Sequence, residues 1–201
     1  MSNASFSLAS LLLALTLAPA ALAQTPVTVR CTPTDGSAAG CYYCPGFEHV
    51  IKLVGTQMRS STVNLLPFHD QDVLITGTWN GAVIDVTSAQ LVTESFSIGG
   101  NGVIGGRFDF SVVAPSGSVA VNCMAFGAGF SVPAADLAFQ LNPTSTMVLG
   151  LGTIGNGGEF KTRLDIPDNA SLIGLRVFGQ GLVVPAAGEA YTTNVDAKEI
   201  G

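Results

Sequence analysis

The four cysteines are the residues with the most evident chemistry in this chain: Cys31, Cys41, Cys44 and Cys123. In an oxidising compartment disulfides are the default state of such residues, and four cysteines allow three pairings, among which the sequence does not choose. Because Cys31, Cys41 and Cys44 share a segment rich in Thr, Pro, Gly and Ser, we expect at least one disulfide there. Cys123 has the strand parity of two neighbouring valines, which predicts that its side chain is buried.

Zinc binding is the alternative use of this cluster. The pattern Cys41-x2-Cys44-x4-His49, together with Cys31, would supply three thiolates and one imidazole to a tetrahedral ion. The second cysteine pair of a zinc knuckle is missing, however, which favours disulfides. A redox role for the CxxC string is disfavoured, because Pro45-Gly46 follows it instead of the helix N-terminus that would lower a thiol pKa.

A second polar cluster comprises His69, Asp70 and Asp72. These side chains are candidate ligands for a divalent cation, although the same string is typical of a solvated turn. The chain has no D-x-D-x-D-G calcium loop, no G-x-S-x-G nucleophile elbow and only two histidines. We therefore predict no catalytic residues and no cofactor.

Two G-x-G-x-x-G strings begin at Gly100 and Gly150. A dinucleotide site needs such a string between a strand and a helix N-terminus, which holds the pyrophosphate. Both strings lead into predicted strands instead. We interpret them as β-turns in which glycine supplies the positive φ angles.

Exposed aromatic side chains could stack on sugar rings, as they do on the open face of many small barrels. The candidates are Tyr42, Tyr43, Phe68 and Trp79. Trp79 shares strand parity with Val73 and Ile75, so the competing interpretation is that it fills a core.

The elements that would position these residues are almost all strands, because β-branched and aromatic segments alternate with turn clusters. Strands are predicted over 50–54, 72–78, 82–87, 96–98, 107–113, 119–125, 160–166 and 175–184. Two short helical turns are predicted, over Pro167–Leu172 and, more weakly, over Pro133–Leu137. Many short strands at this spacing indicate a sandwich or a small barrel.

Charge and hydropathy narrow the functional classes. The net charge is −6 and charged residues make up 11% of the chain, which disfavours binding to nucleic acid or to anionic lipid. Residues 8–22 are an almost unbroken run of Leu and Ala. The string Ala21-Leu22-Ala23 then precedes Gln24. Residues 1–23 therefore match a signal peptide cleaved after Ala23, and the mature chain has no predicted transmembrane span.

Several strings resemble exported, largely uncharacterised bacterial proteins that have two β-modules. They include Asp72-Val-Leu-Ile-Thr-Gly-Thr78, Ile84-Asp-Val-Thr-Ser88, Gly158-Glu-Phe160, Leu164-Asp-Ile-Pro167, Leu172-Ile-Gly-Leu175 and Gln180-Gly-Leu-Val-Val184. The resemblance implies an all-β fold with a small OB-like barrel over 48–94 and a β-sandwich over 95–201. Residues 24–47 form a cysteine-containing segment before them.

These observations predict an exported, non-enzymatic protein that acts at the cell surface or outside the cell by binding or assembly. Its partner would be a second copy of itself, giving a homo-oligomer or filament, or an envelope polysaccharide or protein. The charge-poor strands lack the lysines that normally prevent pairing between strand edges. A secreted carbohydrate-binding module that uses Trp79 and a secreted hydrolase that uses a metal at His69, Asp70 and Asp72 are the alternatives.

Overall fold

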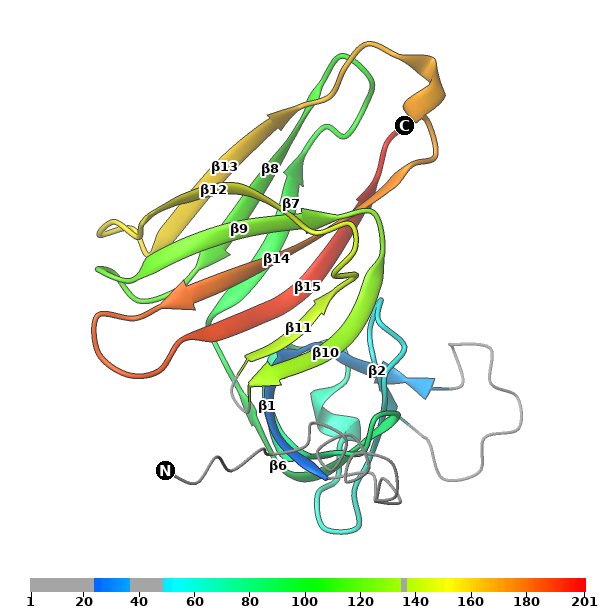
Figure 1. Ribbon diagram of the computed structural model, residues 1–201, viewed down its shortest axis with the longest axis vertical. Coiled ribbons are helices and arrows are strands. Elements are labelled where there is room, and N and C mark those ends of the chain that lie inside the picture. The colour runs from blue at the N-terminus through cyan, green and yellow to red at the C-terminus, as the bar shows by residue number, and fades with distance from the viewer. Residues whose placement is uncertain (1–23, 37–48, 135–136) are drawn as a thin grey trace, which may run out of the picture.

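The computed structural model describes residues 24–36, 49–134 and 137–201, and these residues are nearly all β-structure (Figure 1). The predicted all-β fold is therefore confirmed, whereas the OB-like character of residues 48–94 stays a prediction. The predicted signal peptide lies outside the described residues. Within them, no helix combines the length and the apolar composition needed to cross a membrane.

The first unit is a curved six-stranded sheet with the order β1-β5-β6-β4-β3-β2. β4 and β6 run parallel, and the other neighbouring strands are antiparallel. Its strands are β1 (Thr25–Cys31), β2 (Pro33–Asp35), β3 (His49–Ile51), β4 (Gln57–Arg59), β5 (Val73–Trp79) and β6 (Val83–Leu91). Strand β1 pairs with β5 along its whole length, and its buried residues Val27, Val29 and Cys31 alternate with more exposed ones. The strands at 25–31 and 33–35 thus share one sheet with strands from residue 49 onward.

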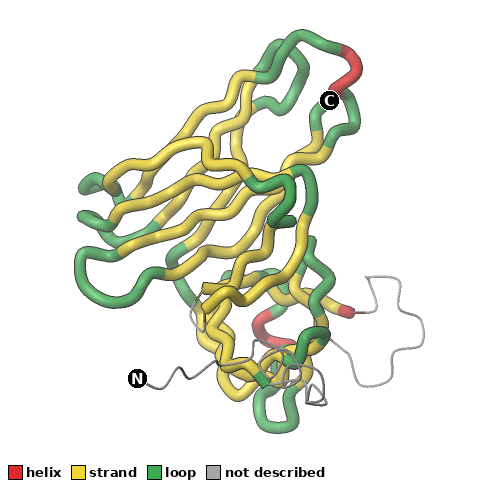
Figure 2. The backbone as a smooth tube through the Cα atoms, viewed as in Figure 1, coloured by secondary structure: helices red, strands yellow, loops and turns green. Residues whose placement is uncertain are grey.

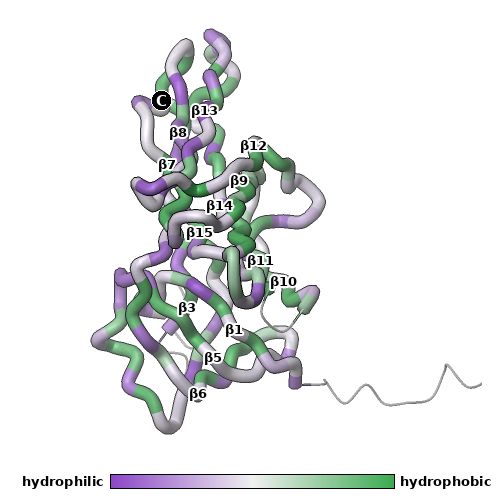
Figure 3. The backbone as a smooth tube through the Cα atoms, turned by 90° about the vertical axis from the view of Figure 1, so that its left-hand side faces the viewer, coloured by the Kyte–Doolittle hydropathy of each residue, from purple (hydrophilic) through white to green (hydrophobic). Residues whose placement is uncertain are grey.

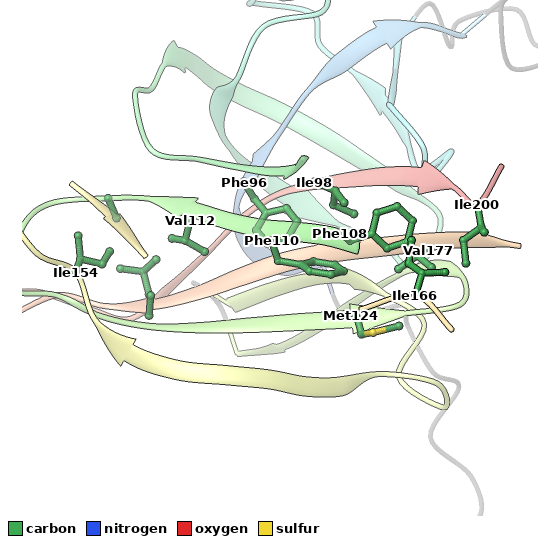
Figure 4. Packing of buried hydrophobic residues seen from close by; sticks show 13 residues of the cluster. Phe96, Ile98, Phe108, Phe110, Val112, Met124, Ile154, Ile166, Val177 and Ile200 are labelled. Carbon is green, nitrogen blue, oxygen red and sulfur yellow. The ribbon is translucent and has the colours of Figure 1, made fainter. Parts of the chain in front are cut away.

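The second unit is a sandwich of a four-stranded sheet, β12-β9-β14-β15, and a three-stranded sheet, β13-β8-β7. Its strands are β7 (Ser95–Gly100), β8 (Arg107–Val113), β9 (Val119–Ala125), β12 (Met147–Thr153), β13 (Glu159–Asp165), β14 (Arg176–Val184) and β15 (Tyr191–Glu199). The core between the sheets contains Phe96, Phe108 and Phe110 with aliphatic side chains from both sheets (Figure 4). Alternation along each strand sends these residues inward.

A hairpin of β10 (Ala128–Ala134) and β11 (Leu137–Leu141) lies between the two units (Figures 1 and 2). Phe130, Val132 and Ala138 pack with the core of the curved sheet, whereas Leu141 packs with Cys123 of β9. The predicted helical turn over Pro133–Leu137 is wrong, because Pro133 and Ala134 end β10 and Leu137 begins β11.

Among the described loops, short 3₁₀ helices include η3 (Leu66–Phe68) and η4 (Ala170–Leu172). The helical turn predicted over Pro167–Leu172 is confirmed as η4. The Asn169 side chain caps it by accepting a hydrogen bond from the Ser171 amide at 3.0 Å. All eight predicted strands are present: those over 107–113 and 119–125 have the predicted bounds, and the others have ends shifted by up to four residues.

Side chains of β15 join the two sheets of the sandwich along one edge. The Asn194 side chain accepts a hydrogen bond from the Phe96 amide at 2.7 Å and donates one to the Phe96 carbonyl at 3.2 Å. Two residues further on, Asp196 accepts a hydrogen bond from the Ile98 amide at 2.8 Å. Lys198 then donates to the Gly100 carbonyl. Alternate residues of β15 therefore supply hydrogen-bond partners to backbone groups of β7, which among the described strands is the outer one of its sheet.

Glycines allow the two sheets of the sandwich to approach closely. A Cβ atom at Gly152 of β12 would lie 2.4 Å from the Phe160 ring, and one at Gly181 of β14 would lie 2.4 Å from Val112. The interpretation of the Gly150 string as a turn is therefore wrong for Gly150 and Gly152, which lie within β12. The Gly100 string does form a turn, in which Gly102 and Gly105 have φ angles of 66° and 69°.

We predict that Asn194→Ala destabilises the protein by about 2–4 kcal/mol, because it leaves a buried amide and a carbonyl of Phe96 without partners. Chemical denaturation measures this change. Asn156→Ala is the matched control in an exposed loop and should shift the free energy of unfolding by less than about 0.5 kcal/mol. Equal stability of the two variants would contradict the structural role of Asn194.

Candidate functional site

The two histidines of the chain contact each other. His49 lies at the start of β3 and His69 follows η3, and His49 Nδ1 is 2.7 Å from His69 Nε2. The rings meet edge to face, with centroids 4.9 Å apart. This imidazole pair ties the loop after η3 to the curved sheet. The sequence did not predict it, because nothing in the local pattern of either residue indicates the other.

The candidate metal ligands His69, Asp70 and Asp72 do not converge on one point. Asp70 forms an ion pair with Lys52 at 2.8 Å, and the hydrogen bond and charge of Lys52 lower the pKa of Asp70. Asp72 instead accepts a hydrogen bond from Thr32 Oγ1 at 2.9 Å. Within the described ranges, no three His, Cys, Asp or Glu side chains lie close enough to hold a metal ion.

The cysteines that the structure describes are free thiols. Cys31 is fully buried in the core of the curved sheet, and Cys123 is buried under the hairpin, as its strand parity predicts. Burial, with a smaller contribution from the charge of Asp72, raises the pKa of Cys31, and burial raises that of Cys123. Neither residue therefore forms the disulfide expected from the sequence. Their thiols lie in separate hydrophobic clusters, a separation that local sequence patterns do not reveal.

Cys41 and Cys44, the other members of the predicted disulfide and zinc patterns, lie outside the described residues. The same holds for the aromatic candidates Tyr42 and Tyr43.

Trp79 ends β5 at the margin of the curved sheet's core. Its ring meets Phe130 of the hairpin edge to face, with centroids 5.3 Å apart. The indole Nε1 is buried and makes no hydrogen bond to the described residues. Phe68 also packs against this core. A ring face held against the hairpin offers less surface for stacking on a sugar, so this arrangement favours a packing role for Trp79.

A polar hollow lies beside the same sheet, lined by Arg59, Ser60, Ser61, Thr62, Thr78, Asp85, Val86 and Thr87. Arg59 forms a two-pronged ion pair with Asp85, whose pKa is lowered by the hydrogen bond. The lining supplies hydroxyl groups but no aromatic ring. It therefore offers hydrogen bonds without the stacking platform that the carbohydrate-binding alternative requires.

The outer surface of the four-stranded sheet is apolar. Asn122 and Met124 of β9 face the sandwich interior, so the alternate residues Val119 and Val121 face outward. The pairing of β9 with its neighbours places Leu151 and Leu182 beside Val121. We define the aliphatic face as Val119, Val121, Val148, Leu151, Leu182 and Val184.

Much of the aliphatic face is open to solvent. Val148 and Leu151 are 65% and 69% exposed, and Val184 is 44% exposed. Leu141 of the hairpin, with Leu53 and Val54, covers the adjoining part of the sheet around Cys123 and Ala125, and Val121 packs partly against this cluster. Exposed aliphatic side chains that adjoin one another on one face of a sheet are typical of an interaction surface.

Charge is nearly absent from the segments that build this face. The sequence has one charged residue, Asp136, between Asp109 and Glu159, and none over 177–188. Figure 3 shows hydrophobic residues along much of β9 and β12, whereas hydrophilic residues occur in β8 and β13. Charge is concentrated on the opposite sheet, where Asp109 lies 3.6 Å from Arg107 and 3.5 Å from Arg163.

The sequence interpretation missed the aliphatic face, because β12 was not predicted as a strand. Its two glycines resemble turn residues, and only pairing with β9 shows that Val148 and Leu151 join a sheet. Comparison of the chain with protein-family models, with curated proteins and with solved structures finds no match.

We predict that Cys31 and Cys123 resist thiol-modifying reagents in the folded protein and become reactive on unfolding, because burial excludes the reagent and disfavours the thiolate. Alkylation in buffer and in denaturant, followed by peptide mass spectrometry, measures each site. Rapid labelling of Cys31 in the folded protein would contradict its position in the core.

Replacing Trp79 tests its packing role. Trp79→Ala should lower the free energy of unfolding by about 2–3 kcal/mol, because it removes the contact with Phe130 at a half-buried site. Trp79→Phe keeps an aromatic ring and should recover most of that loss in thermal denaturation. Unchanged stability of Trp79→Ala, combined with loss of polysaccharide retention, would instead support the carbohydrate-binding alternative.

Proposed function

We propose that this chain is an exported, non-enzymatic protein that acts at the cell surface or outside the cell by binding or assembly, and that the aliphatic face is its docking surface. The observation that supports the proposal is the exposure of Val148 and Leu151 on a face built from segments almost free of charge. Charged residues do occur in the opposite sheet, in β8 and β13, so their absence from β9 and β12 is local to this face.

Association through this face has a direct driving force. Full burial of a valine or leucine side chain contributes roughly 1.5–3 kcal/mol, so three such residues could offset much of the entropy lost on association. Because no charged residue occurs in β9 or β12, a partner would cover these strands without burying their ions. The described carboxylates that suggested a hydrolase, Asp70 and Asp72, instead pair separately with Lys52 and Thr32.

The test replaces the two most exposed residues of the face. The variant Val148→Ser with Leu151→Ser keeps an uncharged surface and removes apolar area from side chains 65% and 69% exposed. We expect the unmodified protein to co-fractionate with the envelope or an extracellular assembly, and the variant to appear mainly as a free, folded protein.

Ile173→Ser with Leu66→Ser is the matched control, because these side chains are 55% and 61% exposed and lie outside the aliphatic face. This control should fractionate as the unmodified protein does. If the Val148 and Leu151 variant also kept its association, the aliphatic face would not be the docking surface.

A further inference from the structure

Four outer strands in the described part of the chain have features that hinder pairing with another strand. The outer strand β13 carries four charged residues, Glu159, Lys161, Arg163 and Asp165. Side chains of β15 occupy the backbone groups of β7. β10 contains a proline and pairs irregularly with β11, and β2 has only three residues. Charge, proline, irregular pairing and short length are the usual means of blocking edge-to-edge association.

The outer edge of β12 lacks these protecting features apart from one irregularity in its pairing. Its sequence, Met147-Val-Leu-Gly-Leu-Gly-Thr153, contains neither a charged residue nor a proline. It is the outer strand of its sheet and pairs only with β9 among the described strands. One register irregularity lies between Val148 and Gly150, and the pairs from Gly150 to Thr153 are continuous. The backbone groups on the outer side of β12 therefore adjoin the aliphatic face.

The charge distribution favours a second copy of the same chain as the occupant of this edge. Two copies that each carry a net charge of −6 repel each other wherever acidic surfaces meet. β12 and its neighbour β9 carry no charge, so pairing β12 with its counterpart brings no like charges together at the contact. Identical strands related by a two-fold axis pair antiparallel, and the surface is then complementary to itself.

We propose that two copies of the chain pair through the outer edges of β12, so that the two four-stranded sheets form one continuous sheet and the two aliphatic faces adjoin. This inference rests on the proposed docking function and names its partner. Leu151 lies one residue from the centre of β12, so in an antiparallel pair it lies close to Leu151 of the second copy.

Charge exchange at Leu151 tests this pairing in the full mature chain. Leu151→Lys and Leu151→Glu each place like charges across the two-fold axis, and the 69% exposure of this side chain means that both variants should fold. By sedimentation equilibrium over a hundredfold concentration range at low salt, the unmodified protein should form dimers. Each variant alone should dimerise about tenfold more weakly or worse. An equimolar mixture of the two should recover dimerisation, and added salt should reduce that recovery.

Ile173→Lys supplies the control for an added charge at another exposed apolar residue and should dimerise as the unmodified protein does. A purely monomeric unmodified protein would overturn the inference, as would dimers that persist in both Leu151 variants or fail to return in the mixture. If the unmodified protein is monomeric but its envelope association still depends on Val148 and Leu151, the proposed function stands and the partner is a different molecule.

Discussion

The sandwich depends on hydrogen bonds from the side chains of one strand to the backbone of another. Asn194 and Asp196 of β15 bind the amides of Phe96 and Ile98, so the two sheets are joined at one edge without a shared backbone ladder. The spacing of two residues sends both side chains to the same side of β15. Since apolar packing alone has little directionality, these bonds fix how β7 lies against β15 and thus how the aromatic core closes.

The adjoining part of β15 contributes to the junction between the two units. The side-chain amide of Gln140, in the hairpin, donates hydrogen bonds to the carbonyls of Arg30 and Thr193 at 2.7 and 3.2 Å. The backbone N–H of Gln140 donates to the side-chain oxygen of Gln180 at 2.9 Å. Thr192 donates to the Ala138 carbonyl at 2.7 Å. This junction therefore connects β1, the hairpin, β14 and β15. The side-chain amides of Gln140 and Gln180 both donate to backbone carbonyls here, so the network holds the hairpin against β14 and β15 in one orientation.

The strands were predictable where side chains alternate, as in β13, because that period reflects one buried face. Strand β12 was not predictable, because the reason for its glycines lies outside its own sequence. A Cβ atom at Gly150 or Gly152 would collide with Thr162 or Phe160 of the opposite sheet. The same limit applies to the candidate sites. Asn194 contacts a strand 98 residues earlier, and His49 contacts a histidine 20 residues later, in a different loop. Local patterns predict which face is buried, but not which residues meet across it.

The two buried thiols impose an order on maturation if the chain folds in an oxidising compartment. Cys31 and Cys123 occupy different hydrophobic clusters, so each is shielded by a separate set of strands. Thiol oxidation takes seconds to hours, whereas a small β-domain folds in milliseconds to seconds. Rapid collapse would remove both sulfurs from competition, leaving fewer partners for mispairing. Burial during folding would then determine which cysteines an oxidant can reach.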